Sequence, residues 1–163
     1  MWIDLSCPVE TERWERVGDS KRGQIYVHLF NLSEQEIRRV ALRLTLRDAA
    51  GNEVKRVMVA QDCEAEARKR FVVHTTADGL PAFDRIDVLP ESVALADGTD
   101  WAVDEQALMD DAFESLTAGP ARVALVALAG KDAVCFPETL GKAWRCVCGR
   151  LNPLEADTCA RCL

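Results

Sequence analysis

Four of the seven cysteines of this 163-residue chain form two close pairs near its C-terminal end, Cys146/Cys148 and Cys159/Cys162, with ten residues between the pairs. Two thiolates on each of two tight turns can converge on one point and supply the tetrahedral sulfur set that Zn²⁺ takes in proteins. Gly149, directly after the first pair, suits such a turn because glycine tolerates positive φ. Four protein sulfurs leave no position for water, so the spacing predicts one structural zinc ion and no catalytic metal.

Disulfides and free thiols are the alternative interpretations of these cysteines. A disulfide within Cys146-Val147-Cys148 would be strained, and nothing in the sequence indicates an oxidising compartment. The first pair has one intervening residue, whereas zinc ligands are usually about 2–4 residues apart. A segment this small cannot bury enough apolar area to fold alone, so metal binding would supply the missing free energy. Zinc is therefore the prediction.

The same tail carries the pattern Trp-x-Cys-x-Cys-x3-Asn-x6-Cys-x2-Cys, in which Trp144 and Asn152 accompany the four cysteines. This pattern resembles the Ran-binding-protein type of zinc finger over residues 144–162. The resemblance implies a small ribbon that binds a protein or single-stranded RNA, with Trp144 packed against the ribbon and Asn152 bridging its two knuckles. The first cysteine pair is one residue shorter than in that family. Gly149-Arg150 stands where ubiquitin-binding members carry Thr-Phe, so ubiquitin binding is not implied.

Two classes of partner can be weighed for the ribbon, residues 142–163. RNA-binding members of the family stack an aromatic side chain between bases and read base edges with arginine, residue types that Trp144, Arg145, Arg150 and Arg161 supply. The candidate partner-binding residues are Trp144, Arg145, Arg150 and Asn152. The ribbon has four basic and two acidic residues, but four thiolates with one Zn²⁺ add a charge of about −2. The loaded ribbon would be near neutral and attract phosphate weakly, and the whole chain, with a net charge of −7, would repel it. A protein partner is predicted, with single-stranded RNA as the alternative.

Outside the tail, the residues whose types could do chemistry are two histidines, an acidic group and three cysteines: His28 and His74; Asp110, Asp111 and Glu114; Cys7, Cys63 and Cys135. Isolated histidines within strands are typically structural, and acids at helical spacing are typical of a solvated helix face. The three cysteines lack adjacent basic residues that would lower a thiol pKa. The sequence has no glycine-rich phosphate loop, no Gly-x-Ser-x-Gly and no His-Glu-x-x-His. It therefore predicts a binding or adaptor protein and not an enzyme.

Residues 24–103 alternate apolar and polar side chains in the manner of short strands. In Val40–Arg47 the even positions are apolar and the odd ones mostly polar, which predicts a strand with one buried face. Turn signals such as Asp97-Gly98 separate the segments. Seven short strands of this kind favour an antiparallel β-sandwich. The other predicted strands are 24–32, 53–60, 68–76, 83–89, 92–96 and 99–103.

A second resemblance covers most of the chain. It is carried by Gly23-Gln-Ile-Tyr-Val, Asn31-Leu-Ser33, Leu46-x-Asp48-Ala-x-Gly51-Asn52 and Asp97-Gly98-Thr99-Asp100-Trp101. These strings resemble small bacterial immunoglobulin-like domains in proteins that end in a zinc ribbon. The resemblance implies an immunoglobulin-like β-sandwich and carries no known activity.

After Trp101 the apolar period becomes helical. Asp104–Leu116 is predicted as a helix with Asp104 as its N-cap. Pro120 and Gly130 bracket a second apolar segment, for which a helix is favoured and a buried strand at Val123–Leu128 stays open. The predicted fold class is thus mainly β with a helical segment: an antiparallel immunoglobulin-like β-sandwich over 1–103, a helical connector over 104–141 and a small four-cysteine zinc ribbon over 142–163.

Length and composition bound the remaining possibilities. A chain of 163 residues suits one domain with a small appendage, and a hydrophobic fraction of 48% argues against wholesale disorder. No apolar run approaches the about 20 residues of a membrane span. Acidic residues at positions 4, 10 and 12 argue against a secretion signal. A cytoplasmic location without a membrane partner is therefore expected.

Overall fold

A computed structural model describes residues 2–18, 23–111 and 113–162 of the chain. The chain divides into two compact units, Met1–Asp110 and Asp111–Leu163, and each is described here by itself. Residues 111–141 therefore belong to the same unit as the predicted ribbon.

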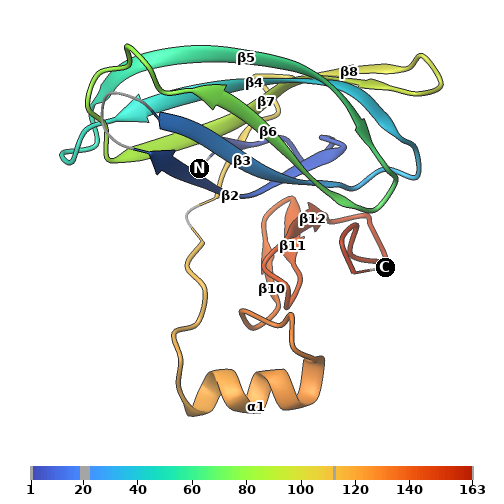
Figure 1. The fold of residues 1–163 in the computed structure, drawn as a ribbon. Helices are drawn as coiled ribbons and strands as arrows, with labels where there is room; N and C mark the ends of the chain where they lie inside the picture. Colours follow the sequence, from blue (N-terminus) through green and yellow to red (C-terminus); the bar gives the residue numbers. More distant parts are fainter. Residues whose placement is uncertain (1, 19–22, 112, 163) are drawn as a thin grey trace. The chain divides into compact units, whose positions relative to one another are not determined.

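The first unit is built from antiparallel sheets (Figure 1). One has three strands in the order β2-β3-β6 and another has four in the order β5-β4-β7-β8, while β1 and β9 pair with each other. The strands are β1 (Trp2–Ile3), β2 (Val9–Gly18), β3 (Gly23–Asn31), β4 (Ile37–Arg47), β5 (Glu53–Ala65), β6 (Arg70–Thr76), β7 (Arg85–Leu95), β8 (Asp100–Ala102) and β9 (Met109–Asp110).

The core of the first unit lies between the three-stranded and four-stranded sheets. Alternate residues of β3 and β4 are buried, as the two-residue period of a strand requires, and both sets belong to one apolar cluster. Because side chains of both sheets enter that cluster, the two sheets pack face to face. The largest of the fully buried apolar side chains on the two strands are Ile25, Val27 and Leu29 of β3 and Ile37, Val40, Leu42, Leu44 and Leu46 of β4.

Two predicted strands, 83–89 and 92–96, are parts of the single strand β7. Pro90 lies within it, opposite Leu42, next to a register irregularity at Ala41/Leu42. Proline cannot donate to a ladder, and it is tolerated at bulges and along unpaired edges. On its other side β7 pairs with β8 only over Ser92–Ala94, so Pro90 faces no strand there.

The predicted fold class is wrong in its helical part, because the only helix in the described residues is the short α1 (Pro120–Ala129). No helix forms over 104–116 within the part the structure describes. The Asp104 carboxylate accepts a hydrogen bond from the Gln106 backbone at 2.9 Å, which closes a local turn. Met109 and Asp110 then pair with β1 as β9. The chain is mainly β, with several small sheets.

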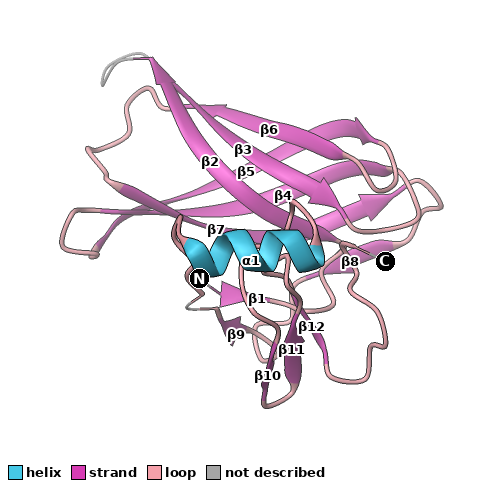
Figure 2. Ribbon diagram, turned by 90° about the horizontal axis from the view of Figure 1, so that it is seen from below, coloured by secondary structure: helices cyan, strands magenta, loops and turns pink. Residues whose placement is uncertain are grey.

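The segment Val123–Leu128, for which helix and strand were both open, lies in α1 (Figure 2). Proline near the first position and Gly130 at the C-cap agree with the usual asymmetry of helix ends. Leu125 is the buried residue of this helix. Among the described residues, no helix combines the length and apolar character that a membrane crossing needs.

The second unit also contains a three-stranded antiparallel sheet in the order β10-β11-β12. Its strands are β10 (Glu138–Leu140), β11 (Ala143–Arg145) and β12 (Leu151–Pro153). The loop between β11 and β12 carries Cys146 and Cys148, and the chain after β12 carries Cys159 and Cys162. The small sheet therefore positions both cysteine pairs.

Candidate metal centre

The first knuckle is the turn that joins β11 to β12. The Cys146 amide donates to the Arg150 carbonyl at 2.9 Å, and the Gly149 amide donates to the Cys146 carbonyl at 2.8 Å. Gly149 has a φ of +90°, a conformation that side chains with a Cβ rarely adopt. The turn thus presents the Cys146 and Cys148 thiols on one side of the hairpin end.

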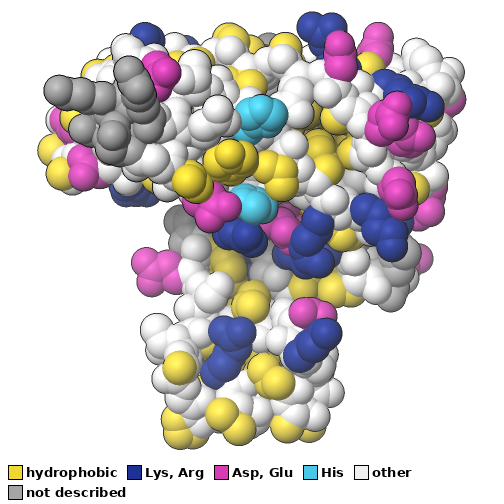
Figure 3. Space-filling view, viewed as in Figure 1, with side chains coloured by type: hydrophobic (Ala, Val, Ile, Leu, Met, Phe, Trp, Pro, Cys, Tyr) yellow, Lys and Arg dark blue, Asp and Glu magenta, His cyan; other side chains and the backbone are white. Residues whose placement is uncertain are grey.

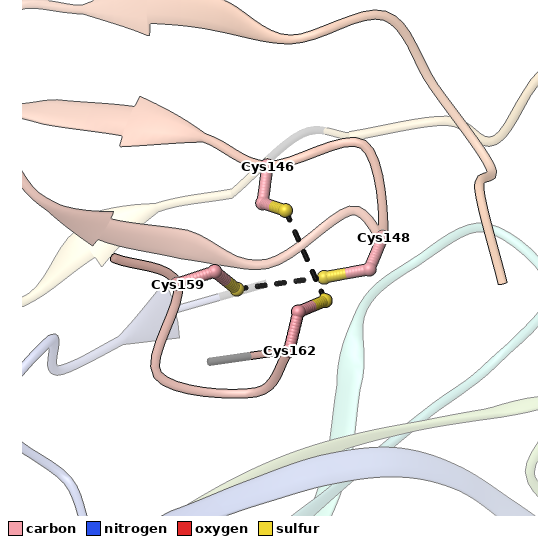
Figure 4. Close-up of side chains that lie close together, drawn as sticks. All are labelled: Cys146, Cys148, Cys159 and Cys162. Atoms are coloured by element: carbon pink, nitrogen blue, oxygen red, sulfur yellow. Dashed lines mark hydrogen bonds between the residues drawn. The ribbon is translucent and has the colours of Figure 1, made fainter. Parts of the chain in front are cut away.

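All four sulfur atoms lie within 4.8 Å of one another, and Figure 4 shows them turned toward a common centre. Two of the separations are 3.7 Å, between Cys148 and Cys159, and 4.0 Å, between Cys146 and Cys162. A tetrahedral ion with metal–sulfur bonds of about 2.3 Å places its ligands about 3.8 Å apart. None of the seven cysteines is joined by a disulfide in this structure. The four residues can therefore hold a metal ion.

Proximity of the thiols changes their protonation. The hydrogen bond from Cys148 stabilises the Cys159 thiolate and lowers the pKa of Cys159 to about 4. The same hydrogen bond, together with burial, raises the pKa of Cys148 above its ordinary value. Burial is the main reason that the pKa of Cys162 rises to about 11. A metal ion that binds all four as thiolates must therefore displace protons from the site.

Asn152 joins the two knuckles from the interior of the ribbon. Its side chain is fully buried, at 0% exposure. Its Oδ1 accepts a hydrogen bond from the Ala160 amide at 2.9 Å, between the second pair of cysteines. Its Nδ2 donates to the Arg150 carbonyl at 3.2 Å, at the end of the first knuckle. Trp144, which is half-buried, donates from Nε1 to the Ala156 carbonyl at 2.9 Å and ties β11 to the chain between the knuckles.

Arg145 braces the first knuckle. Its side chain is 4% exposed and donates to Asp111 and Glu138, each at 2.9 Å, and to the Gly149 carbonyl at 3.0 Å. Its guanidinium also lies 4.4 Å from the centre of the Phe113 ring. Burial opposes its positive charge, but the hydrogen bonds to the two carboxylates outweigh that penalty and raise the pKa of Arg145. Arg145 was one of the partner-binding candidates from the sequence, but its side chain is buried and bonded within the second unit. Arg150, another of those candidates, is half-buried.

Sequence reasoning missed four residues around the site: Asp111, Phe113, Cys135 and Glu138. Asp111 was expected on a solvated helix face, yet its side chain is only 11% exposed and bonds to Arg145. The buried Cys135 thiol donates to the Cys146 carbonyl at 3.3 Å, and burial raises the pKa of Cys135. No local pattern identifies these residues, because their contacts lie 7 to 34 residues away along the chain and depend on how the second unit folds.

The histidines lie in the first unit, and the two of them are visible at the surface in Figure 3. His28 Nε2 is 2.7 Å from a carboxylate oxygen of Glu15, and His74 stacks on Tyr26 with ring centres 6.0 Å apart. A cavity of about 360 Å³ in the same unit is lined by Arg43, Arg47 and Asp87 among others, and neither histidine lines it.

Comparisons with protein-family models, with curated proteins and with solved structures find no match for this chain. Its function must therefore be inferred from the four-cysteine cluster and its surroundings.

Proposed function

We propose that residues 142–163 of the second unit form a structural zinc ribbon of the Ran-binding-protein type that binds one Zn²⁺ through Cys146, Cys148, Cys159 and Cys162. The observation that carries this proposal is the convergence of four sulfurs within 4.8 Å. Zinc is the divalent ion that most often takes four cysteines in a tetrahedron. With every coordination position filled by sulfur, the ion supplies folding free energy and leaves no site for a reacting water.

We infer that the protein is a non-catalytic binding or adaptor protein whose partner is another protein. Four large hydrophobic side chains of the second unit are more than half exposed, which suits burial against a protein surface. They are Val123, Leu128, Phe136 and Leu154. Single-stranded RNA is a less suitable ligand, because two carboxylates hold Arg145, one of the candidate RNA-binding residues, inside the second unit. Thiols kept free for a metal suit a reducing compartment such as the cytoplasm.

Metal analysis tests the zinc site directly. Protein purified without chelator is expected to contain about one zinc per chain by elemental mass spectrometry, since one closed set of ligands holds one ion. Cys159→Ser should lose the zinc. Cys63→Ser, which removes a half-buried thiol of the first unit, is the matched control and should keep it. Zinc-free wild-type protein, or zinc retained by Cys159→Ser, would contradict the proposal.

A titration with random single-stranded RNA at low salt separates the two partner classes, because electrostatic binding is strongest there. The zinc-loaded protein is expected not to bind. Binding that disappears in Trp144→Ala and Arg150→Ala would favour the RNA alternative. Leu128→Ser alters a side chain that is 88% exposed. In a pull-down with the full chain, this variant should retain less of the partner protein than the wild type does, and its zinc content should be unchanged.

A further inference from the structure

The chain enters the second unit through a stretch without regular secondary structure, which we call the entry segment (Asp111 and residues 113–118). Although it is irregular, it is anchored: the Leu116 carbonyl accepts a hydrogen bond from Arg122 of α1 at 3.1 Å, and three further contacts hold the segment elsewhere. Asp111 accepts a hydrogen bond from Arg145, the Phe113 ring lies against the guanidinium of Arg145, and the Leu116 amide donates to the Val134 carbonyl at 2.8 Å.

All three anchors lead to the first knuckle. Arg145 directly precedes Cys146 and also donates to the Gly149 carbonyl at 3.0 Å. The Phe113 ring approaches Gly149 so closely that a Cβ there would lie 3.0 Å from it. Val134, which receives the Leu116 hydrogen bond, donates its own amide to the Val147 carbonyl at 2.7 Å, between Cys146 and Cys148. The entry segment is thus attached to residues 145–149 and to Val134, which is hydrogen-bonded to Val147.

Resting on the zinc site proposed above, we propose that metal binding fixes the entry segment, with Arg145 as the positioning residue that joins it to the knuckle. A ribbon this small has little apolar core, so its knuckles depend on the metal for their shape. When the metal leaves, residues 145–149 no longer hold Arg145 in place. The anchors on Asp111 and Phe113 are then released together.

The consequence is an entry segment whose flexibility depends on the metal. The chain from Asp111 to the residue before α1 contains nine residues. Released and fully extended at about 3.4 Å per residue, it would span up to about 30 Å. Loss of the metal therefore turns the entry segment from a fixed part of the second unit into a flexible stretch of chain.

Hydrogen–deuterium exchange of the full chain, read by mass spectrometry with and without a zinc chelator, tests the proposal. Removing zinc should speed exchange of residues 113–118 at least about tenfold, together with residues 143–153. Faster exchange in 143–153 alone, with 113–118 unchanged, would overturn the inference and leave the zinc site standing. Zinc content measured on the same samples distinguishes failure of this inference from failure of the proposed zinc site. A wild-type protein that contains no zinc before the chelator is added contradicts the zinc site itself.

Single substitutions test whether Arg145 is the residue that links metal binding to the entry segment. Arg145→Gln keeps all four cysteines, so zinc should stay bound while residues 113–115, whose anchors run through Arg145, exchange as fast as in the metal-free protein. Arg39→Gln is the matched control, because Arg39 forms an exposed ion pair with Asp62 in the first unit, and it should match the wild type.

If Arg145→Gln loses zinc, the same contacts can be removed by changing the entry-segment residues that Arg145 touches. Asp111→Asn and Phe113→Ala together leave every knuckle residue unchanged. They should free residues 113–115 in the zinc-loaded protein, while the Leu116 amide keeps its bond to the Val134 carbonyl. Wild-type exchange in this double variant, with zinc bound, would show that the guanidinium does not hold the entry segment and would refute the proposal.

Discussion

Replacing Asn152 with alanine is the sharpest test of how the two knuckles cooperate. Asn152 is fully buried and accepts a hydrogen bond from Ala160 while donating one to Arg150. The variant removes this acceptor from the part-buried Ala160 amide, and the loss of a hydrogen bond to a group shielded from water costs about 1–3 kcal/mol. The 3.2 Å bond to the Arg150 carbonyl adds less, because it is longer and a carbonyl has a second lone pair.

The cost should appear as weaker zinc binding. Since the knuckles form as the metal binds, a loss of about 2 kcal/mol in the bound state lowers the zinc affinity about 30-fold. A competition titration against a chromogenic chelator at neutral pH measures this affinity. Asn52→Ala removes an exposed turn hydrogen bond to Asp48 in the first unit and should leave the affinity unchanged. An unchanged affinity in Asn152→Ala would mean that the knuckles are already joined without metal, and the reasoning would fail.

Three further predictions concern the site and the core. Zinc binding near neutral pH should release about two or more protons, measured by calorimetry in buffers of different ionisation enthalpy, because two site thiols have a raised pKa; affinity should therefore fall as pH falls, and a pH-independent affinity would contradict this. Gly149→Ala combines a φ of +90° with a Cβ 3.0 Å from an aromatic ring and should weaken zinc binding about tenfold or more, whereas Gly98→Ala, at a φ of +86° with open space, should not. Leu44→Ala, at 1% exposure, should lower the free energy of unfolding in urea by about 2–5 kcal/mol, against less than about 0.5 kcal/mol for Met58→Ala at 58% exposure.

The sequence was most informative where local spacing decides the structure. The four cysteines could be predicted as one cluster because each pair lies on its own tight turn, and the clustering of their sulfurs confirms it. Alternation along Val40–Arg47 likewise predicted a strand with one buried face, which is found in β4. In both cases the deciding contacts lie within a few residues of chain.

Prediction failed where distant residues decide the structure. Residues 104–116 have a helical apolar pattern, yet Met109 and Asp110 pair with Trp2 and Ile3 at the other end of the first unit. Asp111 bonds to Arg145, which lies 34 residues farther along the chain. A single sequence contains no local signal for either contact, so tertiary pairing overrides the helical pattern without warning.

The position of β4 has a practical consequence. It pairs with β5 on one side and with β7 on the other along its whole length, so its amides cannot exchange until the four-stranded sheet opens. They are expected to be the slowest of the first unit and to report its global unfolding. In an isotope-labelling experiment they serve as an internal standard, and a metal-dependent change in their rate would reveal that the state of the ribbon is communicated to the larger unit.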